Sequence, residues 1–447
     1  MLASKQVAVS LLQLSELEAG CSEARQAEHI TNCDQVDGLV EEQKKAISKR
    51  MNFVKKMTVE SSALQLVQVH GAADQEAILR QNSIEWGSHL TFDDYLQRER
   101  LLRRALFTST RRCWALVNPA LPDTEFLASC ESYERPDCSL VYATDPNANG
   151  QSLATQKGSC WAIGSVFTPP EHRGNGYATR LMTLLARAAA SHGCRFATLY
   201  SDIGPHFYNR LGWTPHLCRS LILDIPKWTA RRHADANVHP TTALCYPSTD
   251  PGAAGIFIPP PAPAPTPTPG FSMPVRADAV HWLLARSRHH AGTLGLPLPD
   301  CYGHTAGHAY VLYTLDFKTA RVKVLARRFD PVLPHAFSAA VHACIAHVGD
   351  VYPGRFSRLE MWDPCSQEAE ALGAVVYASG TDEKGVLSGG KDEKAVLTGD
   401  KDAPAACVVD RKESLSSLMI LSHEGDDPVL PKSGEVCWRG NEFVHWV

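Results

Sequence analysis

The sequence predicts a mixed α/β protein with two domains separated by a proline-rich connector. Strand-like and helix-like segments alternate between residues 60 and 225. Residues 259–270, PPPAPAPTPTPG, favour an extended connector, because each proline fixes φ and lacks a backbone donor. The 447 residues are 44% hydrophobic and 21% charged, which is typical of globular proteins. We therefore expect a first domain at 61–228, a linker at 229–275 and a second domain at 276–447.

The first predicted domain begins with a strand, LQLVQVH (64–70), and two helices, from Gln75 to Trp86 and from Phe92 to Leu106. The runs CWALVN, TEFLASCESY and CWAIGSVF then predict three strands of an antiparallel meander, joined by turns such as DPNANG. After a tight corner, apolar residues from Leu181 to Ala189 recur at helical spacing until His192 and Gly193. RFATLYS predicts a strand, GPHFYNRLGW a short helix and CRSLILDI a last strand. The predicted order is βααβββαβαβ.

The second predicted domain has fewer signals of function. RADAVHWLLARSRHHAG and PHAFSAAVHACIAHV predict helices, HAYVLYTLDF with ARVKVLARRF predicts a hairpin, and SRLEMWD predicts a strand. At about 380–403 a ten-residue glycine-rich and charged unit occurs twice, too few copies for a stacked solenoid, so we expect a surface insertion. Residues 1–60 are polar and helix-prone, and we treat them as an N-terminal extension.

Composition argues against several classes of partner. A formal net charge of -4 gives no global attraction to nucleic acid or anionic membranes, and no apolar run is long enough to span a bilayer. The 14 cysteines form no CxxC pair and follow no signal peptide, so we expect reduced thiols and a cytoplasmic protein. We expect no metal: Cys301, His304 and His308 lack a fourth ligand, and the group from His342 to His347 does not share one helical face.

The corner VFTPPEHRGNGYATRLM (166–182) carries the clearest functional signal. A strand that stops at Thr168 and a helix that starts near Gly176 leave several backbone N–H groups without partners, beside the positive end of the helix dipole. Gly174 and Gly176 would let a phosphate approach, and Arg173 adds a positive charge. The pattern predicts an anion site, although a plain strand–helix turn fits it about equally well when it is taken alone.

Two motifs resolve that choice. Arg173-x-x-Gly176-x-Ala178 after VFTPP, followed by FYNRLGW on a short helix, resembles the acetyl-CoA signature of the GNAT superfamily of N-acetyltransferases over roughly residues 60–225. The longer runs SVFTPPEHRGNGYATRLM, LYSDIGPHFYNRLGW, SCESYERP and CWRGNEFVHW resemble the fungal lysine N6-acetyltransferases of lysine catabolism. The resemblance implies a GNAT-like acetyl-CoA-binding domain. The element pattern of the second α/β domain fits a degenerate GNAT-like fold that lacks a glycine corner.

The resemblance also implies which residues hold acetyl-CoA. Val166, Phe167 and Thr168 would bind the pantetheine amides along a splayed strand. The N–H groups of Arg173, Gly174, Asn175, Gly176, Tyr177 and Ala178 would hold the pyrophosphate. Ser201 stands where many GNAT members carry an asparagine that contacts the cofactor, so that contact is in doubt here.

An amine with a pKa of about 10.4 must lose a proton before it attacks a thioester, and the leaving thiolate must gain one. We expect Tyr208 to be the acid, with a core tyrosine as the alternative. Glu131 is the candidate base, with an outward-facing strand carboxylate as the alternative. Asp202 is expected to be a helix N-cap.

The acceptor is the least determined part. A free amino acid needs contacts to its charged groups, and Glu442 and Arg411 are the candidates, with plain surface charges equally compatible. The leading hypothesis is direct transfer, in a ternary complex, of acetyl from acetyl-CoA to the ε-amine of free L-lysine. The alternatives are another amine (a polyamine, another amino acid or a protein lysine) or a CoA-binding regulatory protein without catalysis.

Overall fold

A computed structural model describes residues 64–87, 90–120, 126–144, 153–232, 240–246, 269–377, 404–423 and 430–446. The predicted N-terminal extension, the DPNANG turn, most of the connector and the repeat at 380–403 lie outside these residues. The chain divides into two units, residues 1–67 with 116–127, and residues 68–115 with 128–447. The described part of the first unit is short, at 64–67, 116–120 and 126–127. The hydrophobic clusters and the site described below lie in the second unit.

The elements before the connector follow the predicted order. Their bounds are β1 (Gln65–Gln68), α3 (Ala72–Trp86), α4 (Phe92–Leu102), η1 (Leu106–Thr110), β2 (Arg112–Val117), β3 (Ala128–Ala143), β4 (Leu153–Phe167), η2 (Pro170–His172), α5 (Tyr177–Ser191), β5 (Phe196–Ser201), α6 (His206–Asn209), β6 (Thr214–Pro215), β7 (Arg219–Asp224) and α7 (Ile225–Arg232). The corner lies between β4 and α5, as its prolines and glycines predict.

The elements of the second half confirm both predicted helices and the predicted hairpin. Their bounds are β8 (Thr242–Cys245), β9 (Gly270–Ser272), α8 (Ala277–Thr293), β10 (Cys301–Ala306), β11 (Ala309–Asp316), β12 (Arg321–Arg328), α9 (Pro334–Val351), β13 (Arg358–Trp362), α10 (Ser366–Ala371), β14 (Val375–Val376), β15 (Ala406–Asp410), β16 (Leu415–Ile420), η4 (Ser433–Glu435), β17 (Trp438–Arg439) and η5 (Phe443–His445). No helix among these described elements combines the length and apolarity needed to cross a membrane.

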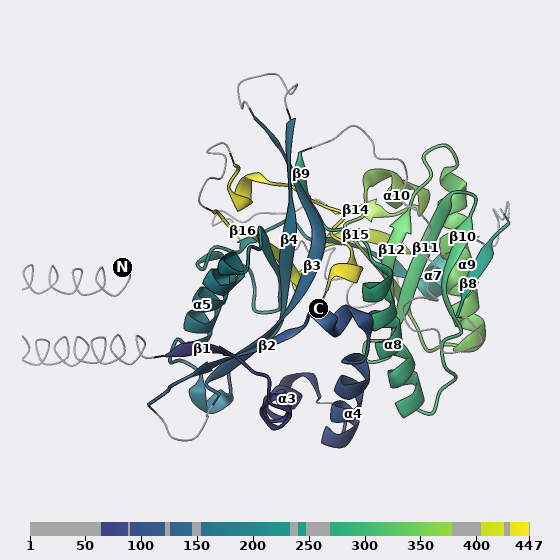
Figure 1. The fold of residues 1–447 in the computed structure, drawn as a ribbon. Helices are drawn as coiled ribbons and strands as arrows, with labels where there is room; N and C mark the ends of the chain where they lie inside the picture. The colour runs from purple at the N-terminus through teal and green to yellow at the C-terminus, as the bar shows by residue number, and fades with distance from the viewer. Residues whose placement is uncertain are drawn as a thin grey trace, which may run out of the picture. The chain divides into compact units, whose positions relative to one another are not determined.

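Two mixed sheets exchange strands across the predicted domain boundary. The first sheet contains the order β3-β4-β5-β16-β6, and the second runs β14-β15-β7-β13-β12-β11-β10-β8 (Figure 1). Strand β7, which was predicted to close the first domain, pairs with β13 and β15 in the second sheet. Strand β16, from late in the chain, pairs antiparallel with β5 in the first sheet. An apolar strand with both faces buried fits either sheet, so its sequence does not specify its partners.

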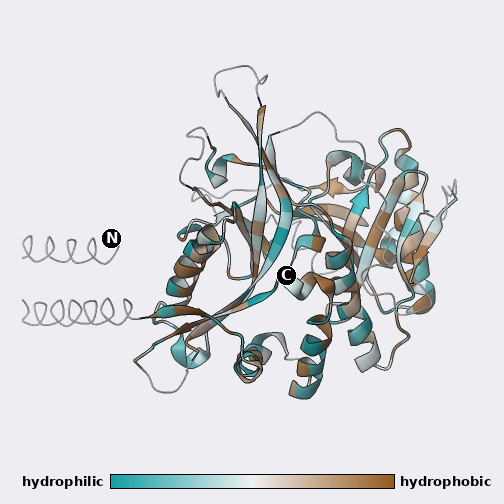
Figure 2. Ribbon diagram, viewed as in Figure 1, coloured by the Kyte–Doolittle hydropathy of each residue, from teal (hydrophilic) through white to brown (hydrophobic). Residues whose placement is uncertain are grey.

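Helices cover both faces of the second sheet. Val311 and Tyr313 of β11 belong to the core that contains α9, whereas Tyr310 and Leu312 belong to the core that contains α8. This alternation is the two-residue period of a strand that is buried on both sides. The strands are brown, and so hydrophobic, over much of their length (Figure 2).

Helix α8 connects the two sheets. Its residues pack against the second sheet and also against Tyr133 and Ala162 of the first sheet, within one hydrophobic cluster. Figure 1 shows α8 between the two sets of strands. The side chains of α8 therefore reach the region where the first sheet opens.

Candidate active site

The first sheet opens where β4 separates from β5. Their parallel pairing runs from Cys160 with Phe196 to Ile163 with Leu199 and continues no further. The register of β4 against β3 shifts at the same place, where Ser165 has a φ of 52°. Such a bulge bends a strand away from its neighbour. The backbone of β4 after Ile163 is left unpaired toward β5, as the predicted splay requires.

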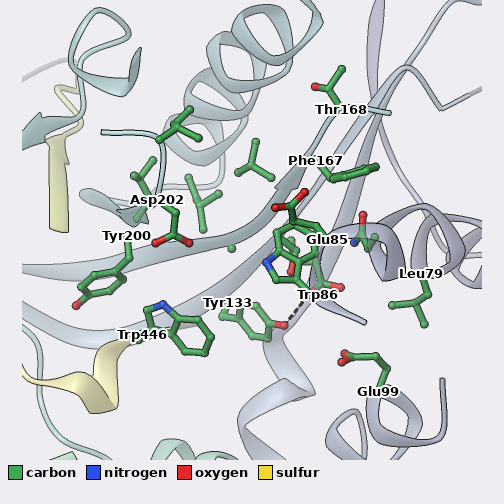
Figure 3. Close-up of a pocket in the computed structure, with 18 of the residues that line it drawn as sticks. Leu79, Glu85, Trp86, Glu99, Tyr133, Phe167, Thr168, Tyr200, Asp202 and Trp446 are labelled. Carbon is green, nitrogen blue, oxygen red and sulfur yellow. Dashed lines mark hydrogen bonds between the residues drawn. The ribbon is translucent and has the colours of Figure 1, made fainter. Parts of the chain in front are cut away.

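A cavity of about 520 Å³ begins at this opening. Residues 164–168 of the β4 side line it, together with Leu199 and Tyr200 of β5. The opposite wall carries aromatic and charged side chains from α3, α4 and α8. Figure 3 shows Trp86, Tyr133, Tyr200 and Trp446 around this space. One continuous cavity therefore joins the strand edge to a chamber that is both aromatic and charged.

The corner has the geometry of an anion cradle. Gly174 and Gly176 have φ values of 81° and 76°, and a Cβ built on either one would meet no atom within 4 Å. Among the described residues, no carbonyl accepts a hydrogen bond from the N–H groups of residues 174–178. Arg173 braces the corner, because its Nε donates to the Thr168 carbonyl at 3.0 Å. Free donors at a helix N-terminus, with open space before them, fit a pyrophosphate.

Most of the residues predicted to bind acetyl-CoA come together here. Val166, Phe167, Thr168, Arg173 and Ala178 line the cavity. Gly174, Asn175, Gly176 and Tyr177 form the corner between Arg173 and Ala178.

Ser201 does not line the cavity. Its buried hydroxyl donates to the Gly204 carbonyl at 2.7 Å and so braces the loop before α6. This bond argues against the predicted contact with the cofactor.

Tyr208 stands in the cavity wall on α6. Among the described residues, its hydroxyl has no hydrogen-bond partner. Burial raises the pKa of Tyr208 well above its ordinary value, and the neighbouring Cys130 and Asp202 reinforce the shift. The phenol therefore carries its proton at neutral pH, as a general acid must before the reaction.

Glu131 also lines the cavity, but both of its carboxylate oxygens already accept hydrogen bonds. Arg111 donates to Oε1, with its Nε at 2.9 Å, and the Tyr133 hydroxyl donates to Oε2 at 2.6 Å. Burial alone would raise the pKa of Glu131, but the charge and hydrogen bonds of Arg111, with the Tyr133 bond, lower it overall. A carboxylate with a lowered pKa is a weak proton acceptor. This arrangement argues against the predicted role of Glu131 as general base.

Asp202 does not cap α6. The N-cap residue of that helix is Pro205, and Asp202 instead accepts hydrogen bonds from the backbone N and the hydroxyl of Ser414, at 2.8 and 3.1 Å. Its carboxylate reaches the cavity between β5 and α6 (Figure 3). The partner was not predictable, because Ser414 belongs to the segment before the exchanged strand β16.

Glu442 lies outside the cavity and is engaged by Arg327. Its Oε1 accepts from the backbone N and from Nη1 of Arg327, both at 3.3 Å. Arg327 binds Glu368 more closely, at 2.8 and 2.9 Å. Burial raises the pKa of Glu442 to about 7; Arg327 opposes this shift and Glu368 adds to it. These contacts argue against the predicted contact of Glu442 with an acceptor.

Arg411 also lies outside the cavity. Its guanidinium is buried and stacks on the Trp362 ring, 3.6 Å from the centroid. The structure therefore does not bring either predicted acceptor contact to the opening of the first sheet.

The sequence reasoning missed the acceptor side of the cavity. Trp282 and Arg286 of α8 line it, as do Tyr95 and Arg98 of α4. A signal was present, because positions 282 and 286 are four residues apart and so share one face of the predicted helix. Only the packing of α8 between the sheets shows where that face points.

No group of three or more histidine, cysteine, aspartate or glutamate residues in the described part of the chain is arranged to hold a metal ion. The expectation that no metal is needed stays a prediction.

Comparisons with known proteins agree with this geometry. Residues 78–213 match the model of a family described as "Acetyltransferase (GNAT) family". A curated "Lysine acetyltransferase" of Yarrowia lipolytica is 32% identical over 151 residues, which cover 29% of this chain and 35% of the relative. The match therefore spans about a third of that relative's length.

Solved structures show weaker likeness. A probable N-acyltransferase of Enterococcus faecalis has a TM-score of 0.43 at 12% identity, with 80% of this chain and 72% of the other covered. A GCN5-related N-acetyltransferase of Kribbella flavida has a TM-score of 0.41 at 15% identity, with 80% and 71% covered. The predicted resemblance to the GNAT family of acetyltransferases is confirmed by the sequence match over residues 78–213 of this chain.

Proposed function

We propose that this protein transfers the acetyl group of acetyl-CoA to the ε-amine of free L-lysine. One observation carries the proposal: a single cavity runs from the splayed strand β4, with Arg173 and Ala178 of the corner, to a chamber lined by charged and aromatic side chains. A chamber of this kind suits a small charged amine. The name of the Yarrowia lipolytica relative supports lysine as the acceptor.

The binding of acetyl-CoA would use the corner and the strand edge. Backbone N–H groups of residues 174–178 would hold the pyrophosphate, and the unpaired edge at residues 166–168 would bind the pantetheine amides. This places the thioester near Tyr208, at the entrance to the chamber. The N–H groups of the splayed strand would also stabilise the oxyanion that forms on the carbonyl.

The reaction needs two proton movements around one substitution. The neutral amine attacks the thioester carbonyl, a C–N bond forms, the C–S bond breaks, and the sulfur leaves as a thiolate. Tyr208 gives its proton to that sulfur, and water removes the proton lost by the amine nitrogen and restores the tyrosine.

Glu131 acts as a positioning residue in this scheme. Its carboxylate accepts the hydrogen bond donated by the Tyr133 hydroxyl. The lone pairs of that phenol oxygen are then free to accept a hydrogen bond from the incoming ammonium group.

A product analysis tests the proposal. The full chain is incubated with acetyl-CoA and, separately, with L-lysine, L-ornithine, cadaverine, spermidine and a lysine-containing peptide, and products are identified by mass spectrometry. We expect N6-acetyl-lysine as the main product, with one CoA released per acetyl group transferred. Faster transfer to a polyamine or peptide would replace lysine as the acceptor. Binding of CoA without release that depends on an amine would support a regulatory protein instead.

We also propose that the reaction occurs in the cytoplasm and serves lysine breakdown. The cysteines in the described part of the chain are free thiols, in keeping with the reducing compartment expected from their spacing. Fractionation of cells that express the tagged chain tests the location. Growth on lysine as sole nitrogen source, with and without the gene, tests the role.

A further inference from the structure

A second cavity continues the chamber on the side away from the corner. It has a volume of about 240 Å³ and shares Trp86, Arg98, Asp202, Arg286 and Trp446 with the first cavity. None of residues 173–178 lines it. The shared residues therefore mark the junction of the two cavities, and the second cavity lies beyond this junction from the corner at residues 173–178.

Two arginines stand at this junction, and they differ in how their charge is balanced. Arg98 on α4 donates to Glu99 Oε1 through Nε at 3.0 Å and through Nη2 at 2.8 Å. Arg286 on α8 lies over the Trp446 ring at 5.1 Å. Within the described residues, its guanidinium makes no hydrogen bond and no ion pair. Burial and the nearby charge of Arg98 lower the pKa of Arg286, while Glu99 and Asp316 oppose this shift. By surface area the Arg286 side chain is half-buried.

Glu99 and Asp316 lie near Arg286, but among the described residues neither forms an ion pair or hydrogen bond with its guanidinium. A partly buried guanidinium without such a direct partner is costly to a folded protein. Folded proteins usually retain such a destabilising group where it binds a ligand. The planar guanidinium of an arginine can bind a carboxylate through two parallel hydrogen bonds. The Trp446 indole packs against the face of the Arg286 guanidinium, so the N–H groups at its edge stay free for such a ligand. An acceptor with its amine at Tyr208 would extend its other end along the cavity, which Arg286 also lines.

We propose that Arg286 binds the α-carboxylate of an amino-acid acceptor and so selects free amino acids over polyamines and protein lysines. The inference rests on the proposed function for the reaction, and it adds the residue and the chemical group that decide the acceptor class.

The test compares L-lysine with cadaverine, which has the same reacting chain end without a carboxylate. In Arg286→Gln, the KM for lysine should rise roughly tenfold to a hundredfold, as expected for a lost charge-assisted contact. Cadaverine kinetics and the KM for acetyl-CoA should change little. The ratio of kcat/KM for lysine to that for cadaverine should therefore collapse.

Two controls separate recognition from general effects. Arg100→Gln removes the same charge from α4, two residues after Arg98, where the side chain is exposed and paired with Glu76 at 3.1 Å. It should leave the lysine-to-cadaverine ratio unchanged. Arg286→Lys should retain part of the preference for lysine. Arg286→Gln should melt near the native temperature, because among the described residues the arginine makes no hydrogen bond or ion pair, and the substitution loses only its contact with the Trp446 ring.

An unchanged lysine-to-cadaverine ratio in Arg286→Gln, with native melting, would overturn the inference and leave the proposed function intact. If the wild-type protein acetylates none of the amines, the proposed function fails. Calorimetry on the CoA-saturated protein then decides the role of Arg286. Lysine that binds the wild type and not Arg286→Gln supports the carboxylate site; equal binding, or no binding to the wild type, refutes it.

Discussion

The Tyr208 hydroxyl has no hydrogen-bond partner among the described residues, and burial raises the pKa of Tyr208 above its ordinary value. Tyr208→Phe keeps the ring in place and removes the proton donor. We predict that kcat falls by roughly 10²- to 10⁴-fold, the range of general acid catalysis, while acetyl-CoA affinity is retained. Stopped-flow release of CoA and calorimetry measure the two quantities. A native kcat in the variant would give Tyr208 a packing role only.

Glu442 should make stability depend on pH. Its folded-state pKa of about 7 exceeds the ordinary value of 4.5, so the folded protein binds more protons between these values than the unfolded chain. The stabilisation of the folded protein that comes from protonated Glu442 is fully present below about pH 4.5 and is lost as pH rises through 7. The glutamine of Glu442→Gln cannot ionise. The free energy of unfolding of the variant minus that of the wild type should therefore increase by on the order of 1–3 kcal/mol between pH 5 and pH 8.

Urea unfolding at several pH values measures this difference. Glu413→Gln, at an exposed position, serves as the control and should follow the wild type at every pH. Parallel curves for Glu442→Gln and the wild type would mean that Glu442 stays ionised in the folded protein.

Single residues were predictable where their partners are close in sequence. The corner could be assigned because its glycines, Arg173 and the start of α5 are consecutive. The surroundings of Glu131 and Glu442 could not be, because Arg111 and Arg327 come from other elements. A carboxylate with an unknown partner can be a base, an ion-pair member or a surface charge. Arg286 was missed for the same reason.

The corner between β4 and α5 acts as one element, and Gly176→Val tests it. A side chain there would project into open space at the N-terminus of α5, where the pyrophosphate is proposed to lie. We predict a large loss of acetyl-CoA affinity by calorimetry, with a native circular-dichroism spectrum. Gly193→Val is the matched control, because Gly193 at the other end of α5 has a φ of 79° and equally open space. It carries the same backbone strain and should keep cofactor affinity; equal losses in both variants would point to strain alone.

Long elements were predictable and very short ones were not. The stripe on α5 and the hairpin of β11 with β12 carry enough residues to show their period. Strands β6, β14 and β17 have two residues each, which is too short for any periodicity. Such strands form because a neighbouring strand offers hydrogen bonds, so their existence depends on tertiary structure.

At the scale of the whole molecule, the exchange of β7 and β16 joins the two halves into one folding unit. A fragment that ends at residue 228, the predicted domain boundary, would expose β5 without β16 and β7 without β13 and β15. We predict that this fragment lacks a cooperative thermal transition and binds a hydrophobic dye. Near-ultraviolet circular dichroism and dye fluorescence measure both properties. A fragment that melts cooperatively and binds acetyl-CoA would show that the first sheet is stable alone.

The same exchange has a consequence for protein synthesis. Ser201 of β5 pairs with Leu415 of β16, so the first sheet acquires this neighbour only after the chain has been synthesised beyond Leu415 and that segment has left the ribosome. Until then the edges of β5 and β7 are open to wrong partners, and pairing between distant segments is slow. Cells should need chaperones to hold the nascent chain in this interval. Yield should respond to the rate of translation of the second half more than to the stability of the finished protein.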